Sequence, residues 1–164
     1  MINTLILTSA LAGQFTAIPD PIKAGNPYLE IRHIKMMDNV DAGDALGANR
    51  ADLFALVIIN KKTYKTEIMS KDDGEPMWKI PLDMSSRYSR IHLSIKDEDG
   101  GLEGKDDHID INPRSGRKDL QFTYDRYTGR ISGGVRGKAH ATIHTTGGGD
   151  DDKATIGFAI TKSW

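Results

Sequence analysis

One stretch decides the fold: Ile91-His92-Leu93-Ser94-Ile95, followed after Lys96 by Asp97-Glu98-Asp99-Gly100-Gly101-Leu102-Glu103-Gly104-Lys105-Asp106-Asp107-His108-Ile109-Asp110. The apolar residues of the first part alternate with polar ones, as in a half-buried β-strand. In the second part, half of the fourteen positions are acidic, and Lys105 is the one lysine or arginine that opposes them. We therefore expect a strand that ends in an acidic, glycine-containing loop.

This acidic loop has the composition of a cation site. Carboxylates held close together repel each other unless a cation lies between them, and Ca²⁺ accepts six to eight oxygen ligands from flexible loops. Asp97 and Asp99 are two residues apart, so in an extended segment both project to the same side. Gly100 and Gly101 allow the chain to turn back, so that Asp106 or Asp107 can return a third carboxylate. A solvated acidic loop is the alternative.

The rest of the chain predicts more short strands and no sustained helical period. Leu53–Ile59 is a nearly continuous, β-branched apolar run, which favours a central buried strand. Pro81 places the strand at 77–82 at an edge or a bulge. Strands are also expected at 28–34, 63–69, 120–124, 139–145 and 154–161, separated by turn-forming residues. Short strands at regular spacing predict an all-β fold, an antiparallel β-sandwich.

Bulk composition excludes several classes of protein. A length of 164 residues suggests one domain with a sizeable core. The chain has 22 lysines and arginines against 23 aspartates and glutamates, so no overall basic field points to nucleic acid as a partner. Cysteine is absent, which excludes disulfides and thiolate sites. No apolar run approaches the roughly 20 residues of a membrane-spanning helix.

The N-terminal residues have two interpretations. Residues 1–12 are apolar and end in Ala10-Leu11-Ala12, an A-x-A cleavage pattern that suggests a secretory signal and a secreted or periplasmic location. A first strand of the domain is the alternative, because the run is short and has no basic residues before it. We expect an N-terminal segment over 1–27 and one β-sandwich domain over 28–164.

Over Tyr28 to Ile111 the chain resembles the C2 domain family. Three regions carry the likeness, in the order in which the three loops of that family occur. The first loop is matched at its two ends, by Met37-Asp38 and by Ala51-Asp52-Leu53-Phe54. The second is matched by Glu75-Pro76-Met77-Trp78, and the third by Asp97-Glu98-Asp99 and Asp106-Asp107-His108-Ile109. The chain departs from the family in a longer first loop, in Leu53 at a proline position and in Asp110 at a glycine position. Residues 111–120 look more like divergent bacterial C2-like modules.

The resemblance implies a calcium site at one end of the sandwich and docking on an anionic membrane or a protein partner. The candidate ligands are Asp38, Asp52, Asp97, Asp99, Asp106 and Asp107. So many carboxylates exceed the charge of one Ca²⁺, which favours more than one ion. Asp72, Asp73 and the run Asp150–Asp152 are expected to be solvated.

Two other functions stay open. The first is a structural protein, such as a homo-oligomer, in which calcium rigidifies a protein–protein interface. The second is a metal-dependent hydrolase, although neither a nucleophile elbow nor a phosphate loop is present, and we expect no enzyme. His140 and His144 lie four apart on a strand, roughly 13 Å, which is too far for one zinc. Lys61, Lys62 and Lys65 are expected to guard a solvated edge or to contact lipid.

Overall fold

The computed structural model describes residues 15–18, 25–37, 51–98 and 106–162. These residues form strands and no helix: β1 (Pro27–Met36), β2 (Asp52–Ile59), β3 (Lys62–Lys65), β4 (Met69–Ser70), β5 (Asp73–Gly74), β6 (Trp78–Pro81), β7 (Tyr88–Asp97), β8 (Asp107–Ile109), β9 (Leu120–Asp125), β10 (Arg130–Gly133), β11 (Gly137–Lys138), β12 (Ile143–Thr146) and β13 (Ala154–Lys162). Within the same ranges, no helix has the length and apolarity needed to cross a bilayer.

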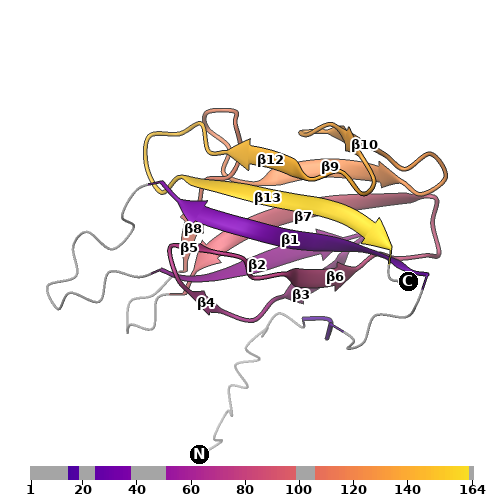
Figure 1. The fold of residues 1–164 in the computed structure, drawn as a ribbon, viewed down its shortest axis with the longest axis horizontal. Helices are drawn as coiled ribbons and strands as arrows, with labels where there is room; N and C mark the ends of the chain where they lie inside the picture. The colour runs from indigo at the N-terminus through magenta and orange to yellow at the C-terminus, as the bar shows by residue number, and fades with distance from the viewer. Residues whose placement is uncertain (1–14, 19–24, 38–50, 99–105, 163–164) are drawn as a thin grey trace, which may run out of the picture.

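The strands pair into two antiparallel sheets (Figure 1). The smaller sheet has the order β12-β13-β1-β5, and β6 also pairs with β1. The larger sheet has the order β11-β10-β9-β7-β2-β3, with β4 on β2 and β8 on β7. The prediction of an all-β, antiparallel sandwich is therefore confirmed.

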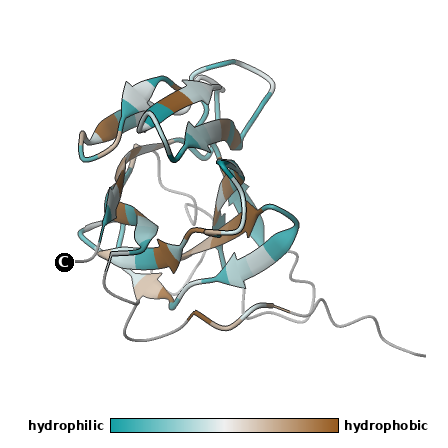
Figure 2. Cartoon of the chain, turned by 90° about the vertical axis from the view of Figure 1, so that its right-hand side faces the viewer, coloured by the Kyte–Doolittle hydropathy of each residue, from teal (hydrophilic) through white to brown (hydrophobic). Residues whose placement is uncertain are grey.

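The core lies between the two sheets and follows from the alternation of side chains along each strand. In β7, Ile91, Leu93 and Ile95 are almost fully buried, because every second side chain points to the same face of a sheet. Figure 2 shows hydrophobic residues recurring between hydrophilic ones along the strands. The rings of Phe122 in the larger sheet and Phe158 in the smaller sheet stack with centroids 5.3 Å apart, so that this pair joins the two layers.

The expected strands are mostly confirmed. The run 53–59 forms β2, which lies between β7 and β3 as a central strand. Pro81 ends β6, an edge strand whose pairing within the described residues is with β1 alone. The stretch expected to be one strand over 63–69 is instead divided into β3 and β4. At the break, the Thr66 hydroxyl accepts a hydrogen bond from the Ala55 N–H at 2.9 Å and takes the place of a backbone carbonyl in the ladder.

The strand directions define two ends of the sandwich. β7 runs from Tyr88 to Asp97, and its neighbours β2, β8 and β9 run the opposite way. The acidic end is where β2 and β8 begin and β7 ends, and the opposite end carries the turn between β9 and β10. Because a strand rises roughly 3.3 Å per residue, the two ends lie about 30 Å apart.

Part of the N-terminal segment lies on the domain. The backbone N–H of Thr16 donates to the carbonyl of Thr63 at 2.6 Å, and Ile18 packs against the core. The signal-like residues 1–12 lie outside the described residues, so a secreted or periplasmic location stays a prediction.

Candidate functional site

The acidic end brings together candidate ligands from three strands. Asp52 begins β2, Asp97 ends β7 and Asp107 begins β8. Asp97 lies directly opposite Asp107 in one ladder and opposite Leu53 in the other. Directly opposed residues have Cβ atoms roughly 5 Å apart. The pairing of β7 with β8 thus places two carboxylate residues side by side, as the loop composition predicts.

Asp97 is the buried member of this group, with 2% of its surface exposed. It continues the inward row of Ile95 and Leu93, and its Oδ1 accepts the backbone N–H of Asp52 at 2.6 Å. Burial of a carboxylate is costly unless hydrogen bonds compensate, and this bond provides part of that compensation. An ionised carboxylate offers about four lone-pair sites, so one carboxylate can accept hydrogen bonds and also bind a cation.

The other described candidates are closer to solvent. Asp52 is half-buried, whereas Asp106 and Asp107 are exposed. Asp38 and Asp99 lie outside the described residues. Within the described residues, no three histidine or carboxylate side chains are placed to hold one metal ion together. The donors that the structure describes are carboxylate oxygens, which are the ligands that Ca²⁺ takes.

Asp72 and Asp73 are engaged rather than simply solvated. Asp72 Oδ1 accepts the Ala51 N–H at 2.9 Å, which fixes the entry into β2. Asp73 lies 2.9 Å from His33 Nε2 and 3.4 Å from Lys35 Nζ. The hydrogen bond from His33, together with Lys35, lowers the pKa of Asp73.

Glu98, the residue after Asp97, forms an ion pair with Lys65. Glu98 accepts from Lys65 Nζ at 2.8 Å, and the same ammonium lies 4.0 Å from the centroid of the Phe54 ring. Glu98 therefore faces away from the inward carboxylate of Asp97, as the spacing along the strand predicts. Lys65 is held by these two contacts and is not a loose surface cation, whereas Lys61 and Lys62 are exposed.

A second acidic residue, Asp110, has a structural role that its sequence context did not indicate. It is 2% exposed, and its carboxylate accepts the N–H groups of Asn112 at 2.9 Å and Gly149 at 2.7 Å. Its backbone N–H donates to Asp152 O, and its carbonyl accepts from Ala154. Asp110 thus ties the loop after β8 to the hairpin between β12 and β13. The glycines of that hairpin are docked on the loop rather than projecting into solvent.

Two histidines of the larger sheet share one carboxylate. His92 Nε2 lies 2.6 Å from Asp119 Oδ2, and His108 Nε2 contacts Asp119 Oδ1. An ionised carboxylate only accepts, so both imidazoles donate from Nε2. Burial raises the pKa of Asp119, but the bond from His92, the charge of His108 and the bond from Ser94 outweigh it, and the net shift is downward. No pattern in the sequence indicates this group, because its members come from β7, β8 and the loop before β9.

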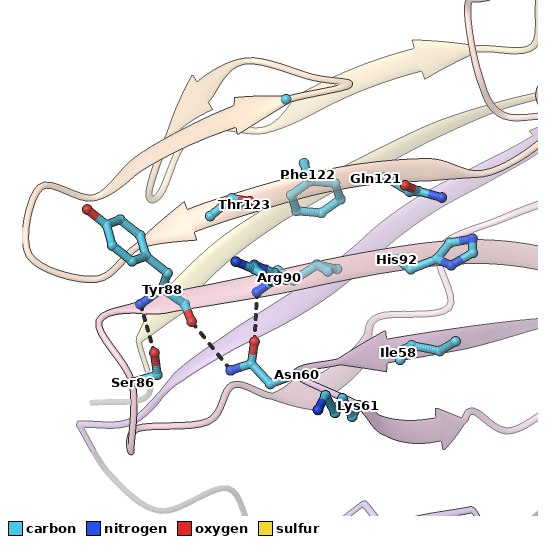
Figure 3. A pocket seen from close by; sticks show the side chains of 12 residues that line it. Ile58, Asn60, Lys61, Ser86, Tyr88, Arg90, His92, Gln121, Phe122 and Thr123 are labelled. Carbon is cyan, nitrogen blue, oxygen red and sulfur yellow. Dashed lines mark hydrogen bonds between the residues drawn. The ribbon is translucent and has the colours of Figure 1, made fainter.

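An open groove of about 690 Å³ lies on the outer face of the larger sheet (Figure 3). Arg90 and His92 come from β7, Gln121 and Thr123 from β9, and Asn60 and Lys61 from the turn after β2. The Asn60 side chain fixes one edge of the groove, because its Oδ1 accepts the Arg90 N–H at 2.9 Å and its Nδ2 donates to the Tyr88 carbonyl at 3.4 Å.

Comparisons with known proteins support the fold. No protein-family model matches the chain, and no curated protein matches it. A solved structure of two C2 domains of extended-synaptotagmin 2 matches with a TM-score of 0.50 and 10% identity, over 99% of this chain and 48% of that one. Human GIVD cytosolic phospholipase A2 matches with a TM-score of 0.45 and 13% identity, over 86% of this chain and 17% of that one. The chain thus spans about half, or less, of the proteins that it matches. The fold is a C2-like β-sandwich.

Proposed function

We propose that this chain is a non-enzymatic, calcium-binding C2-like module that docks on an anionic membrane surface or a protein partner through its acidic end. The observation that carries the proposal is the pairing of Asp97 with Asp107 beside Asp52 at the end of the sandwich. Asp97 and Asp107 would supply carboxylate oxygens to calcium. No three described side chains are placed to hold one ion together, so Asp38 and Asp99, which lie outside the described residues, would complete the set, with Asp52 and Asp106 as further candidates. Calcium there would cancel the repulsion between them and leave a cationic contact for an anionic partner.

The ligand chemistry supports calcium over a transition metal. The candidate donors at this end are hard carboxylate oxygens, which suit calcium, whereas zinc is usually held by cysteine sulfur and histidine nitrogen. The chain has no cysteine, and the paired histidines His92 and His108 are bonded to Asp119 instead. A fold shared with the C2 domains of extended-synaptotagmin 2 agrees with a docking module.

Docking is tested by sedimentation of the protein with phosphatidylserine vesicles, in saturating calcium and in chelator. We expect calcium-dependent binding that weakens as salt increases, because screening shortens the range of the charges. The variant Asp52→Asn with Asp107→Asn should lose this binding. The matched control, Asp150→Asn with Asp151→Asn, removes the same charge from two exposed residues of the β12–β13 hairpin and should retain it.

The alternative functions give different results in the same samples. Calcium-dependent growth in mass without lipid, seen by light scattering, would indicate an assembly protein in place of a docking module. Binding to vesicles that is unchanged in chelator would contradict the calcium-dependent mechanism. A metal-dependent hydrolase would instead release product from a chromogenic ester or phosphoester when calcium is added.

A further inference from the structure

The end of the sandwich opposite the acidic end carries a basic cavity. Its volume is about 630 Å³, and four cationic side chains line it together with one carboxylate: Arg87, Arg130, Arg136, Lys138 and Asp125. Cavities that bind small ligands have volumes of roughly 300–1,000 Å³. We infer that this cavity binds a phosphoryl group, either free in solution or carried on a lipid headgroup.

The one carboxylate of the cavity is already neutralised. Asp125 accepts from Arg87 through two bonds, Nε to Oδ1 at 3.1 Å and Nη2 to Oδ2 at 2.7 Å, and from the Tyr127 N–H at 2.9 Å. The bond from Arg87, with further bonds from Tyr127 and Thr128, lowers the pKa of Asp125 well below its usual range. Asp125 therefore stays ionised at neutral pH and is matched by Arg87, so the remaining cations determine the charge of the cavity.

Those cations outnumber the acids beside them. Arg130 in β10 lies directly opposite Lys138 of β11 in one ladder and opposite Asp125 of β9 in the other. The like charge of Lys138 in that position is destabilising. No ion pair joins Arg130, Arg136 or Lys138 to a carboxylate within the part of the chain that the structure describes. The carboxylate of Asp125 is already bonded to Arg87, so a bound dianion would offset the positive charge that remains on Arg130, Arg136 and Lys138.

Arg87 forms a pre-organised wall of the cavity. Its guanidinium carbon lies 4.9 Å from the Tyr88 ring centroid and 5.4 Å from the Tyr127 ring centroid. The guanidinium also donates the two hydrogen bonds to Asp125. A guanidinium has five N–H donors in a planar fork that matches the oxygens of a phosphoryl group. Two of these donors are used on Asp125, so Arg87 retains donors for a ligand without losing its orientation.

The test is a calorimetric titration of the full chain with inorganic pyrophosphate in the presence of chelator, which removes calcium from the measurement. We expect saturable binding that weakens at least roughly tenfold in Arg130→Gln with Arg136→Gln, because two charge-assisted contacts are lost. The matched control is Arg114→Gln with Arg117→Gln, an equal charge loss in a separate depression lined by Asn112, Lys118 and Gln121, and it should keep the wild-type affinity.

Every result of this experiment bears on the inference. An equal loss of pyrophosphate affinity in both double variants would mean that binding follows general basicity, and would overturn the inference. The inference would also be overturned if the wild type bound neither pyrophosphate nor phosphatidic acid vesicles. Capture by phosphatidic acid vesicles in chelator, lost in Arg130→Gln with Arg136→Gln, would identify a lipid as the source of the phosphoryl group. Binding of pyrophosphate without capture by these vesicles would identify a soluble phosphate. Because the cavity and the acidic end lie at opposite ends, Asp52→Asn with Asp107→Asn should bind pyrophosphate normally even if the calcium proposal fails.

Discussion

The carboxylate of Asp97 accepts a hydrogen bond from the backbone N–H of Asp52 at 2.6 Å. This bond joins the end of β7 to the start of β2, which are neighbouring strands of the larger sheet. One carboxylate therefore has two roles in our account, since it joins the ends of two neighbouring strands and belongs to the proposed calcium ligands. The two roles separate experimentally, because the first persists without calcium.

The first prediction concerns this structural role. Asp97→Ala should destabilise the protein by about 1–3 kcal/mol in chelator, because the Asp52 N–H loses its acceptor. Asp97→Asn keeps an acceptor oxygen and should cost less. Unfolding in urea provides the measurement, and the exposed Asp106→Ala is the control. Equal stability of Asp97→Ala and the control would show that the bond contributes nothing.

The second prediction concerns the packing of the β12–β13 hairpin on Asp110. A Cβ added at Gly149 would lie 2.8 Å from Asp110 Oδ2, and one added at Gly147 would collide with the Asp110 carbonyl oxygen. We expect Gly147→Ala to destabilise the protein by about 1–3 kcal/mol through overpacking. Asp150→Ala, next in the same hairpin but exposed, should be close to neutral. A stable Gly147→Ala protein would contradict the docked arrangement of the hairpin.

The third prediction concerns the stack between the sheets. Phe158 is fully buried, and Phe158→Ala should cost about 3–5 kcal/mol. A double-mutant cycle with Phe122→Leu and Phe158→Leu should reveal a coupling of about 0.5–1.5 kcal/mol. Denaturant unfolding of the four proteins gives this value. Simple additivity of the two single changes would mean that the rings contribute only their buried area.

The fourth prediction concerns acid stability. The pKa of Asp119 is lowered in the folded protein, so its contribution to stability is present above the unfolded pKa of about 3.9 and is lost as the pH falls through the folded value. The wild type should therefore lose thermal stability more steeply below about pH 4 than Asp119→Asn does. Melting temperatures measured from neutral to acidic pH compare the two. Parallel curves for the two proteins would rule out this linkage.

Local patterns in the sequence were sufficient for the strands that form the core. The alternation over Ile91–Ile95 and the apolar run Leu53–Ile59 specify burial directly, because side-chain direction repeats every two residues. The acidic composition after β7 predicted that carboxylates come close together, and the pairing of β7 with β8 places Asp107 opposite Asp97. The calcium site itself stays a prediction.

Contacts between segments that are distant in the chain could not be predicted from local sequence patterns. His92, His108 and Asp119 meet only because β8 and β9 pair with successive stretches of the same side of β7. Their spacing along the chain carries no period that signals this contact. The glycines 147–149 have the composition of an exposed turn, yet their missing side chains let Asp110 approach. The basic cavity likewise depends on the register that sets Arg130 against Lys138.

Calorimetric titration with calcium tests the central claim most directly. The account predicts saturable binding by the wild type, at least roughly tenfold weaker in Asp52→Asn with Asp107→Asn because two anionic ligands become neutral. The control Asp150→Asn with Asp151→Asn should bind as the wild type does. Absence of calcium binding by the wild type, or an equal loss in both double variants, would contradict a calcium site at the acidic end.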